Sequence, residues 1–146
     1  MSAQEAIIYM NSVLDAESKD PQVIEFATEG IYDWDGSKAV FAYEETELTG
    51  LPGTRTSLVV SPDNVTLSRV GTMTGTTVFR EGEKNVFPLR TPYGQTMLGI
   101  RAGKIESSFS EEGGSLLLEL ITDFDHTNVN KNRIEMKVKK TAPWSI

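Results

Sequence analysis

The strongest signal in the chain is an alternation of apolar and polar residues with a period of two. In Arg133–Lys139, the residues Ile134, Met136 and Val138 alternate with charged side chains. This period is that of a β-strand with one buried face, because successive strand residues point to opposite sides. The same alternation predicts strands over Lys104–Ser110, Ser115–Phe124 and Ile24–Trp34.

Candidate turns recur along the whole chain at intervals of 9 to 16 residues. Thr, Val and Ile together supply 35 of the 146 residues, and these β-branched side chains favour a pleated surface. Short strands at such spacing are typical of a sandwich or a barrel, and ten turns imply about eleven extended segments, some of them halves of one bent strand. The candidate turns are Ser18–Pro21, Asp35–Gly36, Gly50–Gly53, Ser61–Asn64, Gly71–Gly75, Glu81–Glu83, Pro92–Gly94, Gly103, Gly113–Gly114 and His126–Asn128.

One segment, Ser2–Glu17, also fits a helix. Ala6, Met10 and Val13 have helical spacing there, and the first turn is acidic. However, Ala6, Ile8 and Met10 satisfy the strand pattern equally well, and Ile and Val prefer strands. We therefore expect this segment to be a strand.

The length and the short turns together predict a single domain spanning residues 1–146. Consecutive strands joined by short turns pair antiparallel. A long antiparallel meander tends to close on itself, because closure removes the exposed edges that template aggregation. We therefore expect an all-β antiparallel meander closed into a β-barrel, with a β-sandwich as the alternative.

An ordered set of segments resembles the YwiB-like proteins, a family of small bacterial cytosolic proteins. The resemblance implies a calycin-like barrel, related in shape to lipocalins and fatty-acid-binding proteins. It implies no activity, since the family has none established. The segments, which lie roughly between Glu25 and Lys139, are Tyr43–Gly50, Gly53–Val60, Phe79–Gly82, Thr91–Gly94, Leu98–Ile100 and Glu111–Leu120.

Composition removes several classes of function. The absence of cysteine excludes disulfides, thiolate metal sites and cysteine nucleophiles, and it fits a reducing compartment. A formal net charge of −7 repels nucleic acids and anionic membranes. The longest apolar runs, Ala6–Met10 and Ala39–Tyr43, have five residues, whereas a spanning helix needs about 20. With no basic leader at the start, we expect a cytoplasmic protein without a nucleic-acid or membrane partner.

No residue pattern indicates catalysis or metal binding. The single histidine, His126, lies in Asp125–Asn128, a composition typical of a hairpin turn. With no cysteine and no second histidine, it is a poor metal or haem ligand. The acidic stretches Asp33–Ser37 and Glu111–Gly114 also have the composition of turns. We therefore expect no catalytic residue, metal or cofactor, and nothing in the sequence favours an enzyme.

The most informative charged residues are Glu44, Glu45 and Glu47. Adjacent strand residues point to opposite faces, so in a barrel either Glu44 or Glu45 must face inward. Pairing of this strand with Arg55–Val60 in an even register would place Glu47 opposite Arg55 and Glu45 opposite Ser57. Tyr43 and Glu45 would then share a face.

An inward carboxylate needs a partner, because a buried charge is costly unless it is paired and hydrogen-bonded. Arg55, Arg69 and Arg101 are available as partners, and a tyrosine hydroxyl could donate. Such a group could anchor the polar end of a small ligand, and the alternative is a structural ion pair or a carboxylate reached by water near the open end. The candidate ligand-binding residues are Tyr43, Glu45, Arg55, Tyr93 and Arg101.

Two functions therefore stay open. The first is binding of a small, partly apolar ligand in the barrel, which small inward residues such as Thr28, Gly30 and Ser107 would favour. The second is a barrel filled by side chains that acts through its surface, by self-association or by binding another protein. Bulky inward residues such as Phe26 and Phe109 would favour the second.

Overall fold

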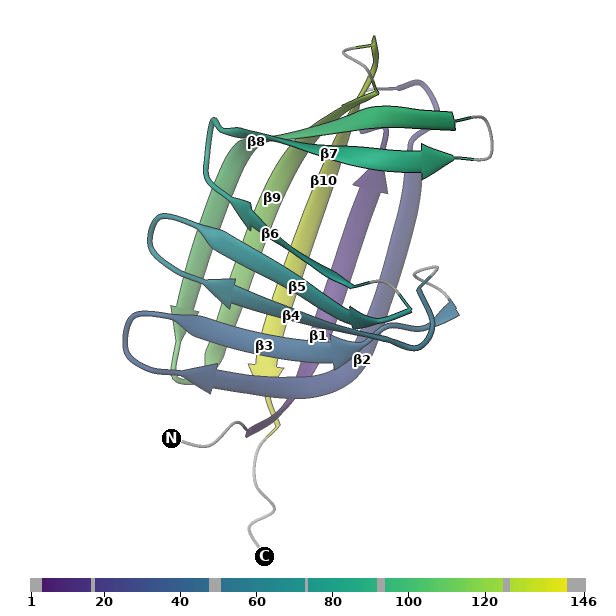
Figure 1. Ribbon diagram of the computed structural model, residues 1–146. Coiled ribbons are helices and arrows are strands. Elements are labelled where there is room, and N and C mark those ends of the chain that lie inside the picture. Colours follow the sequence, from purple (N-terminus) through teal and green to yellow (C-terminus); the bar gives the residue numbers. More distant parts are fainter. Residues whose placement is uncertain are drawn as a thin grey trace, which may run out of the picture.

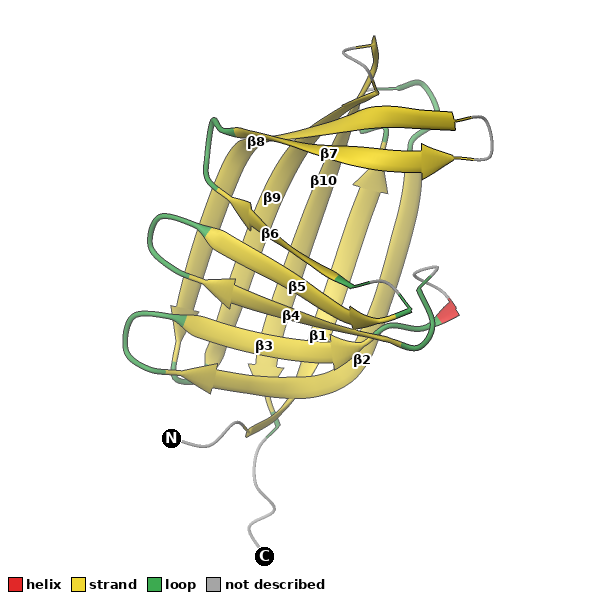
Figure 2. Ribbon diagram, viewed as in Figure 1, coloured by secondary structure: helices red, strands yellow, loops and turns green. Residues whose placement is uncertain are grey.

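The computed structural model describes residues 4–16, 18–47, 51–72, 74–91, 94–124 and 127–141. This part of the chain forms ten strands, and loops join them (Figures 1 and 2). The strands are β1 (Gln4–Leu14), β2 (Gln22–Trp34), β3 (Ala39–Glu44), β4 (Thr54–Val60), β5 (Val65–Gly71), β6 (Gly75–Phe79), β7 (Lys84–Thr91), β8 (Gly94–Ser110), β9 (Gly113–Phe124) and β10 (Thr127–Lys140).

All ten strands belong to one antiparallel sheet with the order β6-β5-β4-β3-β2-β1-β10-β9-β8-β7. The sheet curls so that its two edge strands, β6 and β7, approach each other and nearly close a barrel (Figure 1). Across this seam the Asn85 side chain donates a hydrogen bond of 2.9 Å to the carbonyl of Val78. The predicted antiparallel meander and barrel are therefore confirmed, and the sandwich alternative is wrong because a single sheet supplies both walls.

The segment with two interpretations, Ser2–Glu17, forms strand β1 over Gln4–Leu14. Ile8 pairs with Thr28 of β2 on one side and with Val138 of β10 on the other. The alternation predicted for β10 also holds, since Met136 and Val138 are buried while Lys137 is exposed. The period-two pattern thus identified both the strands and their inward faces.

Gly103 does not form a turn but lies at a bend within one strand, the alternative that the sequence left open for some of the segments. Strand β8 continues from Gly94 to Ser110, and its register with β9 shifts between Ala102 and Lys104. Glycine inside a strand often marks a β-bulge, in which one extra residue bends the strand without ending it. Strand β8 pairs with β7 over Gly94–Arg101 and with β9 over Leu98–Ser110, and the bulge lies within the β9 ladder.

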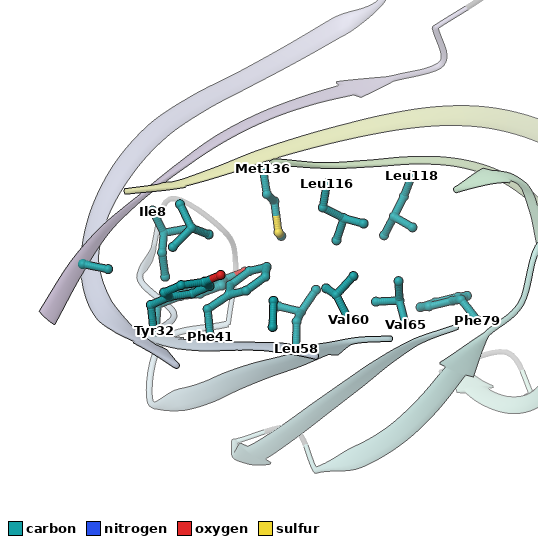
Figure 3. Close-up of a cluster of buried hydrophobic side chains, with 14 of the residues drawn as sticks. Ile8, Tyr32, Phe41, Leu58, Val60, Val65, Phe79, Leu116, Leu118 and Met136 are labelled. Atoms are coloured by element: carbon teal, nitrogen blue, oxygen red, sulfur yellow. The ribbon is translucent and has the colours of Figure 1, made fainter. Parts of the chain in front are cut away.

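Part of the barrel interior is filled by two layers of side chains that face each other (Figure 3). Leu116, Leu118 and Met136, from β9 and β10, meet side chains from the opposite wall. Burial of these apolar groups is the main favourable term that holds the two walls together. The opposite layer, from β2 to β6, contains Tyr32, Phe41, Leu58, Val60, Val65 and Phe79.

The remaining inward side chains are less fully buried than those of the two layers. Several hydrophobic side chains that pack against the core are only partly buried, among them Met10, Phe26, Leu67 and Ile134. Partial exposure of inward residues means that the filled layer does not extend through the whole barrel. Within the described residues, no helix has the length and apolar character needed to cross a bilayer.

Candidate functional site

Polar residues gather inside the barrel where β3 ends and β4 begins. The inward residues of β3 include Phe41 and Tyr43, and the alternation continues to Glu45, which is only 7% exposed. The backbone N–H of Glu45 donates a 2.7 Å hydrogen bond to the carbonyl of Thr54, which fixes the chain just beyond the strand. Of the two adjacent glutamates, Glu45 thus faces the interior and Glu44 faces outward.

The predicted register between β3 and β4 is wrong. Glu44, and not Glu47, lies opposite Arg55, while Tyr43 lies opposite Thr56. The prediction extended the strand to Glu47, whereas β3 ends at Glu44 and a longer connection follows. Because one residue of shift turns every side chain to the other face, the inward residue of β4 at this level is Thr56.

The Glu45 carboxylate has two partners on neighbouring strands. The Thr56 hydroxyl donates a hydrogen bond of 2.6 Å to Glu45 Oε2, and Arg69 Nε lies 3.9 Å from the same oxygen. The Glu45 side chain is 3% exposed and that of Arg69 is 32% exposed. Within the described part of the chain, Glu45 Oε1 and Arg69 Nε have no hydrogen-bond partner. The pair therefore carries one buried acceptor and one buried donor that are not satisfied.

Tyr43 completes the cluster. Burial and the nearby charge of Glu45 raise the pKa of the Tyr43 phenol well above its ordinary value, and Arg69 opposes this shift. The hydroxyl is therefore protonated at neutral pH and able to donate a hydrogen bond. Its ring packs against Phe26 of β2, with the ring centroids 6.4 Å apart. We call Tyr43, Glu45, Thr56 and Arg69 the interior polar cluster.

The cluster lies next to a stretch of β2 that has only one paired neighbour among the described strands. Strand β2 pairs with β3 only over Gly30–Trp34, and within the described residues Gln22–Glu29 pairs with β1 alone. The inward residues Ile24, Phe26 and Thr28 of that stretch are only partly buried. Since Phe26 contacts Tyr43, this stretch of β2 borders the interior polar cluster.

Two of the other predicted ligand residues, Arg55 and Arg101, lie elsewhere. Arg55 is on the outer face, where it forms a surface ion pair of 3.2 Å with Glu44. Arg101 is exposed and neighbours the fully buried Ala102, so it also points outward. Tyr93 lies outside the described residues, as does His126. Of the four candidates that the structure describes, Tyr43 and Glu45 lie together.

Two members of the cluster were missing from the predicted site. Arg69 was named only as one of three partners for the carboxylate, although the alternation Val65, Leu67, Arg69 along β5 places it inward. Thr56 was overlooked because the assumed register turned it outward. The chemistry of the cluster is hydrogen bonding by one carboxylate, one guanidinium and two hydroxyls. No group of three or more metal-ligating side chains occurs in the part of the chain that the structure describes.

Comparison with known proteins places the chain in a family. The family model described as Domain of unknown function (DUF1934) matches residues 8–136. The chain belongs to the DUF1934 family. The crystal structure of the ywiB protein from Bacillus subtilis is similar to this DUF1934 chain, with a TM-score of 0.75 and 20% sequence identity over 96% of this chain and 94% of that one. At this identity the likeness concerns the fold.

The resemblance to YwiB-like proteins predicted from the sequence is thereby confirmed. The nearly closed ten-stranded barrel is the architecture of this DUF1934 member, and the ywiB protein has a similar fold. No curated protein matches the chain. What the DUF1934 barrel does must therefore be argued from the interior polar cluster and its surroundings.

Proposed function

We propose that this DUF1934 protein binds a small, partly apolar molecule at the incompletely filled end of its barrel, with the polar part of the molecule held by the interior polar cluster. The observation that carries the proposal is Glu45 Oε1, a buried carboxylate oxygen without a hydrogen-bond partner in the described residues. Buried polar atoms in folded proteins are nearly always hydrogen-bonded, because an unpaired one costs about 1–3 kcal/mol. A bound molecule would supply the missing donor.

The surroundings of the cluster suit the apolar part of such a molecule. Phe26 lies against Tyr43, and it is one of the inward hydrophobic residues that the filled core leaves partly exposed, together with Leu67 and Ile134. Ligand sites are typically apolar hollows with a few polar groups that fix orientation. Small barrels either fill their interior or hold one ligand, and this one combines a filled layer with a less covered end.

The proposal places the protein among calycin-like ligand carriers in the bacterial cytoplasm. A chain of 146 residues without cysteine is compatible with a reducing compartment. The similar ywiB protein comes from a bacterium, Bacillus subtilis.

A surface role is the second candidate, favoured by a hollow of about 460 Å³ that outward residues of β1, β2 and β10 help to line. Tyr9, which is 47% exposed, borders it together with Glu25 and Lys137. An aromatic ring beside charges of both signs is a composition found at protein interfaces. In this case the filled core would serve as a rigid support for self-association or for another protein.

Native mass spectrometry of protein purified gently from its own host distinguishes the two candidates. Binding predicts a reproducible extra mass that is lost on denaturation. Glu45→Gln should reduce the occupied fraction, whereas Glu44→Gln, the same change on the outer face, should not. A bare mass in the unmodified protein would contradict ligand binding, and the number of subunits observed would then test the surface role.

A further inference from the structure

We infer that the polar part of the ligand is an electrically neutral group with a hydrogen-bond donor next to an acceptor, such as a primary amide or an alcohol on an apolar tail. This inference rests on the proposed function and names the class of ligand for the same site. It follows from two properties of the interior polar cluster, which are its charge and its unsatisfied atoms.

The charge of the cluster disfavours ionic head groups. Glu45 and Arg69 carry opposite charges, and Arg69 Nε lies 3.9 Å from Glu45 Oε2. A carboxylate placed to bind Arg69 would also lie beside the Glu45 carboxylate and be repelled. An ammonium placed to bind Glu45 would lie beside the Arg69 guanidinium. Like charges this close in a partly desolvated site are costly. The Glu45–Arg69 pair therefore selects against ligands with a carboxylate and against ligands with an ammonium group.

The unsatisfied atoms define the hydrogen bonds that the ligand must make. Glu45 Oε1 accepts and therefore requires a donor, while Arg69 Nε donates and therefore requires an acceptor. The Thr56 hydroxyl already serves Glu45 Oε2, so it does not satisfy Oε1. A primary amide offers an N–H and a carbonyl on one carbon, and an alcohol offers both functions on one oxygen.

Tyr43 strengthens the preference for a group that can accept. Its hydroxyl stays protonated within the cluster, because burial and the Glu45 charge both disfavour the phenolate. An amide carbonyl has two lone pairs, so it has the capacity to accept from a second donor such as Tyr43 as well as from Arg69. The apolar tail would extend from the cluster past Phe26, whose ring packs against Tyr43.

The test uses three probes with one tail, which are decanamide, decanol and decanoate. Their affinities are measured by displacement of a fluorescent apolar dye and checked by native mass spectrometry. We expect the amide and the alcohol to bind roughly tenfold more tightly than the carboxylate, which corresponds to about 1.4 kcal/mol. In Glu45→Gln the carboxylate should gain affinity, because the repelling charge is gone. Glu44→Gln removes one negative charge from the outer face and should leave the order of affinities unchanged.

Each other outcome has a distinct meaning. If decanoate binds the unmodified protein as tightly as decanamide, the neutral head group is wrong, while binding in the barrel stands. If none of the three binds and protein from its own host carries no extra mass, the proposed function fails together with this inference. The measurements on the unmodified protein decide the matter even if Glu45→Gln does not fold.

Discussion

The hydroxyl of Thr56 donates a hydrogen bond of 2.6 Å to Glu45 Oε2 inside the barrel. Thr56 is fully buried on β4, and Glu45 follows directly after the end of β3. The bond therefore ties the inward carboxylate to the neighbouring strand and holds it in position for Arg69. In a site of low polarity such a charge-assisted hydrogen bond is stronger than one in water.

Removal of that donor should destabilise the fold. Valine has nearly the same shape as threonine but no hydroxyl, so in Thr56→Val the Glu45 Oε2 atom loses its hydrogen bond. We expect the free energy of unfolding to fall by about 1–3 kcal/mol. Urea denaturation followed by circular dichroism measures the change. Ser57→Ala, on the opposite face of the same strand, is the matched control and should have a smaller effect. Equal midpoints for Thr56→Val and the unmodified protein would contradict the role of the bond.

Gly30 should tolerate no side chain. A Cβ at this position would lie 2.3 Å from the carbonyl oxygen of Ala42 and 2.6 Å from Ile8 Cδ1, where β2 crosses between β1 and β3. Gly30→Ala should therefore lower the free energy of unfolding by about 1–3 kcal/mol through overpacking. Gly75→Ala is the control, since nothing lies within 4 Å of a Cβ there. A melting temperature that is equal in the two variants would show that the strands can move apart.

The stability of the protein should fall in alkaline solution because of buried tyrosines. Burial, with a smaller effect of Asp33, raises the pKa of Tyr32 from 10.0 to about 12. The unfolded chain therefore loses this proton first, so the stabilisation is complete below pH 10 and is lost as the pH rises toward about 12. In Tyr32→Phe the free energy of unfolding should decline less steeply between pH 10 and about 12, because this tyrosine no longer releases a proton on unfolding. Urea midpoints across that range measure the slope, and Tyr9→Phe, a change on the outer face, should leave it unaltered.

Two ion pairs on the outer face should contribute differently to the free energy of unfolding, because one is more buried than the other. Lys84 Nζ lies 2.8 Å from Asp123 Oδ2, with side chains only 24% and 13% exposed. Asp123→Asn should cost about 1–3 kcal/mol, since it leaves a partly buried ammonium beside a neutral amide. The pair of Arg133 and Glu135 is 2.8 Å long but has side chains 51% and 41% exposed. Glu135→Gln should therefore change stability by less than about 0.5 kcal/mol, and similar losses for both variants would refute the dependence on burial.

The fold was predictable because its strongest signal is local. Alternation along β1, β2 and β10 depends only on which residues face the core, so it identified strands such as Gln4–Leu14 before any partner was known. Gly103 shows the limit of local signals. A glycine within an extended region indicates a turn or a bulge equally well, and the pairing of β8 with both neighbours decides between them.

The candidate site was less predictable because it depends on register. An inward Glu45 follows from alternation, but its partners are set by how β3 aligns with β4 and β5. The predicted register was wrong by an odd number of residues. It therefore placed Ser57 instead of Thr56 on the inner face of β4 and turned Arg55 inward, whereas Arg55 is exposed beside Glu44. Strand register is fixed by packing across the sheet and by the length of the connection, and neither can be read from the segment itself.

The meeting of β1 with β10 has a consequence for how the chain folds. In the sheet order of the described strands, each neighbouring pair is consecutive along the chain except β1 and β10. Two meanders, β1–β6 and β7–β10, can thus grow from local hairpins, while contacts such as that of Ile8 with Val138 must bridge almost the whole chain. Loop closure of this length is slow compared with hairpin formation, since its entropic cost precedes any gain from pairing. The β1–β10 ladder is therefore the step at which two open sheets become one barrel, and the interior polar cluster acquires its enclosing wall only then.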